Sequence, residues 1–389
     1  IIMSMESEGG SSKIALNDLP SATLADAVIS YNGIGEFSVL DLQKVLTGKK
    51  VSVAPSISPY SESMSGSSTV KDFETMMQLT YLYFTAPRQD DQAYQTLISM
   101  LETQLAARDK NPKNAFNDSI QQTITCHNPR TLILDVNLLK KADQLRAIEI
   151  YKERFANPAD FTFFFVGNVD PADKAFQAQV CTWLGGLKAN KKLEKAADDK
   201  VRVAMGSQKN YFTRQMETKT ASNRIQYTSY DMPYTLANDL NMEMIGRILS
   251  TRYLESIRER EGGSYGVGCA GWMNRHPVPY AQLIMQFDTD PEKQEKLMNI
   301  IHEEVKTIVE NGPLAKDLQK EKESMLKDFE ENLEKNGYWT DVLSVYYKNG
   351  INYITDYKAA VEAITAETVQ ATLKELVEAG NVFEVVMLP

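Results

Sequence analysis

A helix end and a strand start meet in one stretch of this chain, Tyr253-Leu254-Glu255-Ser256-Ile257-Arg258-Glu259-Arg260-Glu261-Gly262-Gly263-Ser264-Tyr265-Gly266-Val267. The Gly262-Gly263 pair is a typical helix stop, and a strand is predicted to begin at once. Because the turn is tight, the strand folds back beside the helix end. Arg258 in the last helical turn and Tyr265 at the strand start are therefore predicted to face one edge of a domain.

The residues alone leave two interpretations of this pair. Arg258 could donate to a peptide carbonyl, and the Tyr265 hydroxyl could bond a carbonyl or a developing oxyanion. Alternatively, Arg258 stabilises the last carbonyls and the dipole of its own helix, and Tyr265 is a half-buried strand residue. The second interpretation needs fewer assumptions, and the residues leave both open.

Working outward, the same order of elements occurs twice. The first copy is predicted to contain strands at residues 2–7, 50–57, 61–67 and 161–166, with helices at 22–31, 38–46, 70–84, 90–107 and 142–155. The second copy is predicted to contain strands at 224–230, 265–273, 280–288 and 383–388, with helices at 236–259, 291–310 and 315–336. Period-two alternation indicates the strands, and apolar residues at helical spacing indicate the helices.

Two pairs of corresponding positions share one offset, because Val70 precedes Pro291 and Phe161 precedes Val382 by 221 residues each. This agreement predicts a duplicated domain. Hairpins without a strict β-α-β alternation favour an α+β fold of two tandem homologous domains, each a mostly antiparallel sheet with helices packed on one face. The predicted domains are residues 1–187 and 207–389, joined by a polar linker at 188–206.

Composition excludes several classes of protein. The 42 basic and 52 acidic residues give a net charge of -10, which argues against nucleic-acid binding. No apolar run approaches the ~18 residues of a membrane span. The three cysteines are too few for a disulfide scaffold. The three histidines lie too far apart for two of them to hold one zinc ion from a single helix.

Two short clusters have the residue types of metal ligands. His302-Glu303-Glu304 lies within a predicted helix without a second histidine, and is interpreted as a solvated helix face. Cys126-His127 has no second pair of ligands nearby, and is interpreted as a buried cysteine beside a turn. Neither cluster predicts a metal site.

The stretch from Ile257-Arg258 to Tyr265 resembles the non-catalytic half of the pitrilysin/insulinase family of zinc metallopeptidases. The resemblance extends to residues 37–51, to Gly66-Ser67-Ser68 and to residues 82–88, which are similar to the non-catalytic halves of large periplasmic members. It implies that two such domains form one half of a clamshell, which closes on the other half around a peptide. In the family the matching Arg and Tyr reach toward the zinc site, hold the substrate backbone and stabilise the oxyanion.

The resemblance also implies that this chain lacks the family's zinc ligands. The family's His-x-x-Glu-His helix corresponds to residues 24–28, where the ligand positions hold Leu24 and Val28 and the base position holds Ala27. The chain is therefore expected to bind no cofactor and to be inactive alone, with zinc on a complementary half. Arg258 and Tyr265 are the predicted substrate-binding residues, on a turn supported by Gly262 and Gly263.

The partner arrangement has alternatives. The zinc-bearing half is expected upstream on the same polypeptide, and the absence of a start Met before Ile1 favours that arrangement. The chain could instead be a separate inactive subunit of a heterodimeric peptidase, or a peptide-binding scaffold without a proteolytic role. The compartment is open from the residues, and only the resemblance favours the periplasm.

Overall fold

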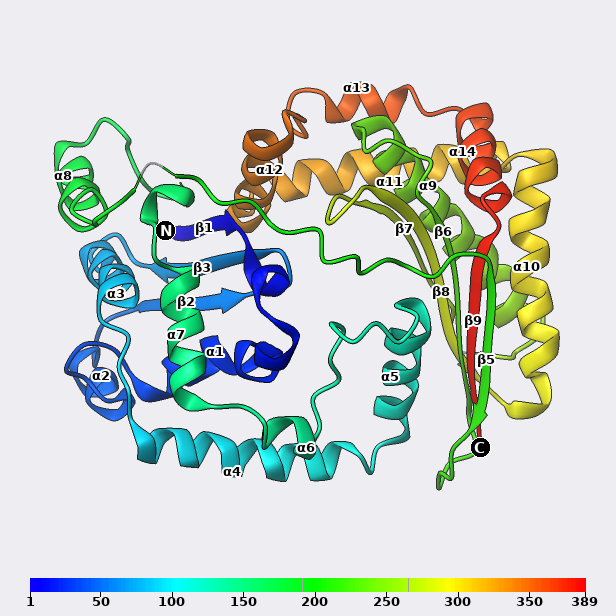
Figure 1. Ribbon diagram of the computed structural model, residues 1–389. Coiled ribbons are helices and arrows are strands. Elements are labelled where there is room, and N and C mark those ends of the chain that lie inside the picture. Colours follow the sequence, from blue (N-terminus) through cyan, green and yellow to red (C-terminus); the bar gives the residue numbers. More distant parts are fainter. Residues whose placement is uncertain (191, 265) are drawn as a thin grey trace. The chain divides into compact units, whose positions relative to one another are not determined.

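The computed structural model describes residues 1–190, 192–264 and 266–389 (Figure 1). These residues form two compact units: unit 1 contains residues 1–108, 132–200 and 333–345, and unit 2 contains residues 109–131, 201–332 and 346–389. These units are defined by which residues contact one another. The predicted domains at 1–187 and 207–389, with a linker at 188–206, are defined instead by the repeated order of elements, and they stay a prediction.

Unit 1 is built on a four-stranded antiparallel sheet of order β2-β3-β1-β4. Its strands are β1 (Ile2–Glu8), β2 (Val51–Ile57), β3 (Ser61–Ser68) and β4 (Thr162–Val166). In β1 every second side chain is buried, with Met3 and Met5 fully inside the core. This alternation fixes which face of the sheet receives the helices.

The helices of unit 1 are α1 (Leu19–Asn32), α2 (Val39–Val45), α3 (Phe73–Thr85), α4 (Asp91–Arg108), α6 (Val136–Leu139), α7 (Gln144–Arg154) and α8 (Lys174–Trp183). Side chains that cap helix N-termini fix several starts: Ser38 accepts from the Asp41 N–H, and Asp143 accepts from the Arg146 N–H. The core packs α1, α3 and α7 with the strands. Helix α12 (Asn336–Asn349) begins in unit 1 and ends in unit 2.

Unit 2 has a five-stranded sheet of order β5-β9-β6-β8-β7. The strands are β5 (Ser207–Thr213), β6 (Ala221–Ser229), β7 (Gly268–Asn274), β8 (Tyr280–Thr289) and β9 (Asn381–Leu388). Only β5 pairs in parallel, with β9, and the other three pairings are antiparallel. The sheet is therefore mostly antiparallel, as predicted.

The remaining helices are α5 (Pro112–Ile124), α9 (Leu236–Tyr253), α10 (Gln294–Asn311), α11 (Ala315–Leu333), α13 (Tyr357–Glu362) and α14 (Ala366–Glu378). Figure 1 shows α10 and α14 on one side of this sheet and α5 on the other. Glu384 of β9 reaches His302 of α10, whereas its neighbour Val385 packs with Phe116 of α5. Successive residues of a strand point to opposite faces, so α5 covers part of the face that the main helices leave open.

Strand register confirms the tandem repeat. Met5 pairs with Met64 and Phe163 in unit 1, and Ile225 pairs with Met285 and Glu384 in unit 2. Each unit 2 residue follows its unit 1 counterpart by 220 or 221 positions. The predicted α+β fold of two homologous domains is thus confirmed, with the offset correct to within one residue.

Several predicted elements need correction. The helix predicted at 236–259 changes to π-helical geometry at Leu254, and the strand predicted at 265–273 begins at Gly268. The sequence analysis also missed several elements, namely β5, α5, α6, α8, α12, α13 and α14. Among the described residues, no helix combines the length and apolar character needed to cross a membrane.

Candidate functional site

Arg258 lies on a π-helical turn at the end of α9. The helix continues from Tyr253 directly into the π-helical residues Leu254–Glu259. Ile257 is fully buried on this turn, whereas Arg258 is exposed. Single π-helical turns within longer helices occur frequently at functional sites. The buried neighbour anchors the turn, and the turn presents Arg258 to solvent.

The two predicted glycines end this helix in different ways. Gly262 has a φ of 53° and donates its N–H to the Arg258 carbonyl at 3.2 Å. The Gly262 bond is that of an αL helix end, and Gly263 adds a donation to the Ile257 carbonyl at 3.2 Å. A Cβ on Gly263 would lie 2.7 Å from Cδ1 of Leu297 in α10. Gly262 is needed for its backbone conformation and Gly263 for close packing.

Hydrogen bonds fasten the loop after the helix to the end of β8. The Ser264 hydroxyl donates to the Asp288 carbonyl at 2.7 Å, and the Thr289 hydroxyl donates to the Gly263 carbonyl. Lys293 adds a bond from Nζ to the Glu261 carbonyl at 3.2 Å. The backbone beside Arg258 is therefore held on several sides, as a precise binding group requires.

Arg258 borders a cavity of about 740 Å³ within unit 2. Its other lining residues are Lys219, Thr220, Gly262, Gly263, Ser264, Asp288, Thr289 and Asp290. Within the part of the chain that the structure describes, the Arg258 guanidinium makes no hydrogen bond or ion pair. The described residues therefore leave its donors unused. Tyr265 lies outside the described residues, so the Arg258–Tyr265 pair stays a prediction.

A second hollow of about 750 Å³ shares Thr220 and Asp288 with this cavity. Lys113 of α5 enters it, pairs with the Asp288 carboxylate and donates to the Ser222 hydroxyl. Sequence reasoning missed Lys113, because its partners Ser222 and Asp288 follow it by 109 and 175 residues. The helical pattern of residues 112–124 could have indicated a helix there, but not the contact of Lys113 with Asp288.

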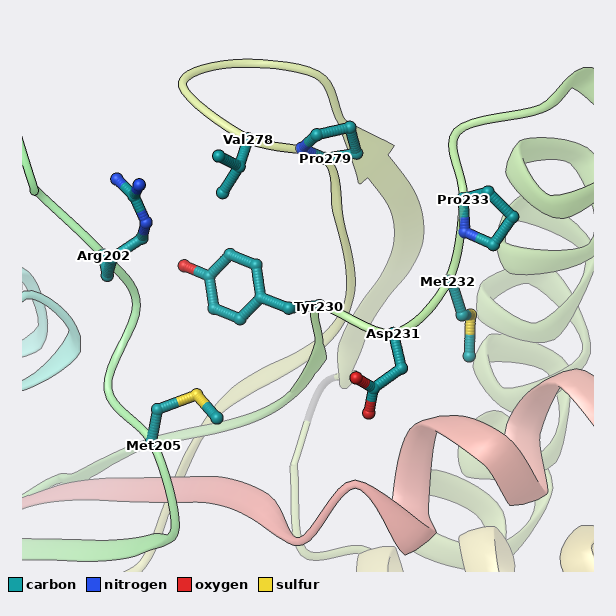
Figure 2. A pocket seen from close by; sticks show the side chains of 8 residues that line it. All are labelled: Arg202, Met205, Tyr230, Asp231, Met232, Pro233, Val278 and Pro279. Atoms are coloured by element: carbon teal, nitrogen blue, oxygen red, sulfur yellow. The ribbon is translucent and has the colours of Figure 1, made fainter. Parts of the chain in front are cut away.

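A third hollow of about 590 Å³ lies at the other end of β6. Figure 2 shows the Tyr230 ring pointing toward Arg202, with Val278 and Pro279 above it. The Tyr230 hydroxyl oxygen accepts the Val203 N–H at 2.8 Å. This hollow is mainly apolar and contains none of the predicted site residues.

The structure corrects both interpretations of the metal-type clusters. His302 is half-buried, since its ring nitrogens contact the Tyr227 hydroxyl at 2.7 Å and the Glu384 carboxylate at 3.0 Å. Burial acts to raise the Glu384 pKa, but hydrogen bonds from His302, Tyr211 and Lys209 outweigh it and lower that pKa to about 2. His302 therefore joins α10 to the sheet, and the prediction of a solvated face was wrong for it.

Cys126 was predicted to be buried, but it is exposed. It and His127 have positive φ values of 50° and 52° in the turn after α5. This turn leaves the cysteine at the surface. Across residues 1–190, 192–264 and 266–389, no group of three or more His, Cys, Asp or Glu side chains is placed to hold a metal ion.

The helix predicted to correspond to the family's zinc motif is α1. Leu24 and Val28 are buried in the core of unit 1, and Ala27 packs against that core. Zinc ligands require nitrogen, sulfur or oxygen donors, which these three side chains lack. The residues present therefore do not fit a zinc ion.

Comparison with known proteins relates the chain to a family of peptidases. Residues 144–325 match the model of the peptidase M16 inactive domain. The chain is a homologue of the M16 zinc proteases through their inactive domain. It is 22% identical over 373 residues to a "Zinc protease PQQL-like" of Arabidopsis thaliana, covering 89% of this chain and 38% of the relative. It is 23% identical over 378 residues to the "Probable zinc protease PqqL" of Escherichia coli, covering 94% and 39%.

Solved structures show the same fold for this M16 homologue. The periplasmic protease PqqL of Escherichia coli matches with a TM-score of 0.85 at 19% identity, covering 100% of this chain and 43% of that chain. A peptidase M16 inactive domain from Pseudomonas fluorescens matches with a TM-score of 0.77 at 16% identity, covering 100% and 92%. The chain spans about two fifths of the length of the curated relatives it matches.

Proposed function

We propose that this chain is the non-catalytic half of a zinc metalloendopeptidase of the pitrilysin/insulinase type. It closes the peptide chamber and supplies hydrogen-bond donors to a reaction centre on the other half. The observation that carries the proposal is the match of residues 144–325 to the M16 inactive domain. Further support comes from Arg258, which lies on a fastened turn and borders a cavity of about 740 Å³.

In this proposal Arg258 and Tyr265 act on the substrate. The Arg258 guanidinium donates to a peptide carbonyl, and the Tyr265 hydroxyl donates to the oxygen that gains negative charge during attack. Donors held in place before the reaction lower its barrier because they need no reorganisation. The turn at Gly262 and Gly263 keeps Arg258 in place. Zinc is assigned to the complementary half, because Leu24, Ala27 and Val28 cannot ligate it.

A reconstituted peptidase tests these roles. The chain is combined with the zinc-bearing half, either fused or as a separate subunit, and cleavage of a quenched fluorescent peptide is followed. Arg258→Ala and Tyr265→Phe are each expected to lower kcat/KM at least tenfold, about 1.4 kcal/mol of transition-state stabilisation. Values within twofold of the parent, less than ~0.4 kcal/mol, would show that the assigned role is wrong.

Arg260→Ala is the matched control, because Arg260 is an exposed arginine two residues further on and does not line the cavity. Its kcat/KM is expected to equal that of the parent. Co-purification of the two halves as separate chains would favour the heterodimer over a single polypeptide. Peptide binding without cleavage, in the presence of an active zinc-bearing half, would favour the scaffold.

A further inference from the structure

Polar side chains line the face of the unit 2 sheet that α9 and α10 leave uncovered. Arg224 and Gln226 of β6 lie beside Gln282 and Gln286 of β8. Arg224 donates from Nη1 to Gln286 Oε1 at 3.0 Å and from Nη2 to Gln226 Oε1 at 3.1 Å. Gln226 in turn donates from Nε2 to Gln282 Oε1 at 2.8 Å. The network fixes the position of the guanidinium.

The Arg224 guanidinium is desolvated, and no described residue gives it an anionic partner. Both of its hydrogen-bond acceptors are neutral amide oxygens, and its Nε is buried without a partner among the described residues. Burial lowers the pKa of Arg224 to about 10. A desolvated charge is unfavourable unless it is paired. Two of the five N–H donors are used within the network, so donors remain for a ligand.

The cavity beside Arg224 suits a carboxylate carried by a peptide. Its volume is about 530 Å³, and Trp272, Tyr280 and Ile284 provide apolar wall. A guanidinium binds a carboxylate through paired hydrogen bonds, which a neutral amide replaces poorly. The glutamine amides add groups that bond a peptide backbone.

Arg224 lies two strand positions away from the residue pair at the edge of the Arg258 cavity. Arg224 pairs with Gln286, and Ser222 pairs with Asp288, which lines the Arg258 cavity. Two residues along a strand span about 7 Å. A peptide that passes from one cavity to the other would therefore bring a side chain to Arg224 within two or three residues.

We propose that Arg224 binds a carboxylate of the peptide substrate and gives this chain a preference for an acidic residue near the cleaved bond. The identification of the bound peptide as a substrate rests on the proposed function. The carboxylate site itself does not depend on it. The carboxylate could belong to an Asp or Glu side chain or to a peptide C-terminus.

Binding of matched peptides tests the site on the full chain. Fluorescein-labelled unstructured peptides that differ only by Glu or Gln at one position, each with an amidated C-terminus, are titrated with the parent chain. The Glu peptide is expected to bind at least tenfold more tightly. Equal affinities, or no binding of either peptide at 1 mM chain (an affinity weaker than about −4 kcal/mol), would overturn the proposal. If a Gln peptide with a free C-terminus binds as tightly as the amidated Glu peptide, the C-terminus can also supply the bound carboxylate.

Two variants separate the site from general damage to the fold. Arg224→Gln is expected to bind the Glu and Gln peptides equally, and a retained preference would contradict the proposal. Gln286→Glu supplies a carboxylate to Arg224 from within the sheet, so it is expected to raise Tm and to abolish the Glu preference. Cleavage of the Gln peptide by the reconstituted parent peptidase is a separate measurement. If the parent chain prefers the Glu peptide in binding but the reconstituted peptidase cleaves neither peptide, the proposed function is wrong and the carboxylate site stands.

Discussion

Arg154 of α7 and Glu194 of the irregular segment after α8 form an ion pair with two hydrogen bonds. Arg154 Nη1 lies 3.1 Å from Glu194 Oε2, and Nη2 lies 3.2 Å from Oε1. The Arg154 side chain is 8% exposed, and that of Glu194 is 23% exposed. The predicted linker at 188–206 is thus fastened to unit 1 at its start, although it has no regular secondary structure there.

Removal of one partner is predicted to destabilise unit 1. Glu194→Gln leaves Arg154 without this carboxylate in a buried position and also removes the ion pair of Glu194 with Lys13, so the free energy of unfolding is expected to fall by about 1–3 kcal/mol. Urea denaturation measures the change. Lys195→Ala is the control, because Lys195 pairs with Glu8 while 79% exposed, and such pairs contribute ~0–1 kcal/mol. Equal effects of the two changes would contradict the inferred role of Arg154.

The buried carboxyl of Glu62 is predicted to lower the free energy of unfolding as pH rises. It is 1% exposed, and burial raises its pKa to about 7, against the opposing effects of the Gly10 N–H and Arg154. Between its ordinary value of 4.5 and about 7 the folded chain binds more protons than the unfolded chain. The sign of the linkage therefore makes stability fall across this window, by on the order of 3 kcal/mol.

Glu62→Gln isolates this contribution, since the amide oxygen can still accept the Gly10 N–H. Urea denaturation at pH 5 and pH 7.5 is expected to show a smaller difference for the variant than for the parent. Glu384 does not interfere, because its lowered pKa affects stability only as pH falls below 4.5 toward about 2. Parallel pH profiles for parent and variant would rule out the assignment to Glu62.

The sequence predicted the parts of the fold that local patterns determine. The hairpin of β2 and β3 and the repeat offset follow from alternation and from helix stops, which act over a few residues. The placement of α5 could not be predicted, because Phe116 and Ile120 pack against Val385 and Met387 at the other end of the chain.

The candidate site was predicted in part for the same reason. The helix stop at Gly262 and Gly263 is local, so the sequence located the turn that carries Arg258. The chemistry of Arg224 depends on its cross-strand partner Gln286, which no nearby residue indicates. Its only sequence signal is the alternation of Arg224 and Gln226 with Ile225 and Tyr227.

The isolated chain is predicted to bind no stoichiometric zinc and to cleave no peptide. Leu24 and Val28 offer no donor atoms and are buried in the core of unit 1. Elemental analysis after dialysis measures the metal content, with the zinc-bearing half purified in parallel as the positive control. About one tightly held zinc per chain would mean that other side chains form a site.

Gly263→Ala is predicted to destabilise unit 2 more than Gly262→Ala. A Cβ at position 263 would lie 2.7 Å from Leu297 Cδ1, and Leu297 is fully buried, so its side chain has little room to move. Overpacking of this kind costs about 1–3 kcal/mol. A Cβ at position 262 meets nothing within 4 Å, so only its positive φ is unfavourable, at about 1 kcal/mol. Thermal and urea unfolding compare the two variants.

A double-mutant cycle tests whether the Leu297 contact is the cause. Leu297→Val shortens the side chain next to position 263, so Gly263→Ala should cost less in that background than in the parent. Because the same turn carries Arg258, Gly263→Ala should also lower kcat/KM of the reconstituted peptidase, and Leu297→Val should restore part of it. Additive free energies, meaning a coupling below about 0.5 kcal/mol, would show that Leu297 does not limit this turn. The low activity would then need a cause other than displacement of Arg258 by this contact.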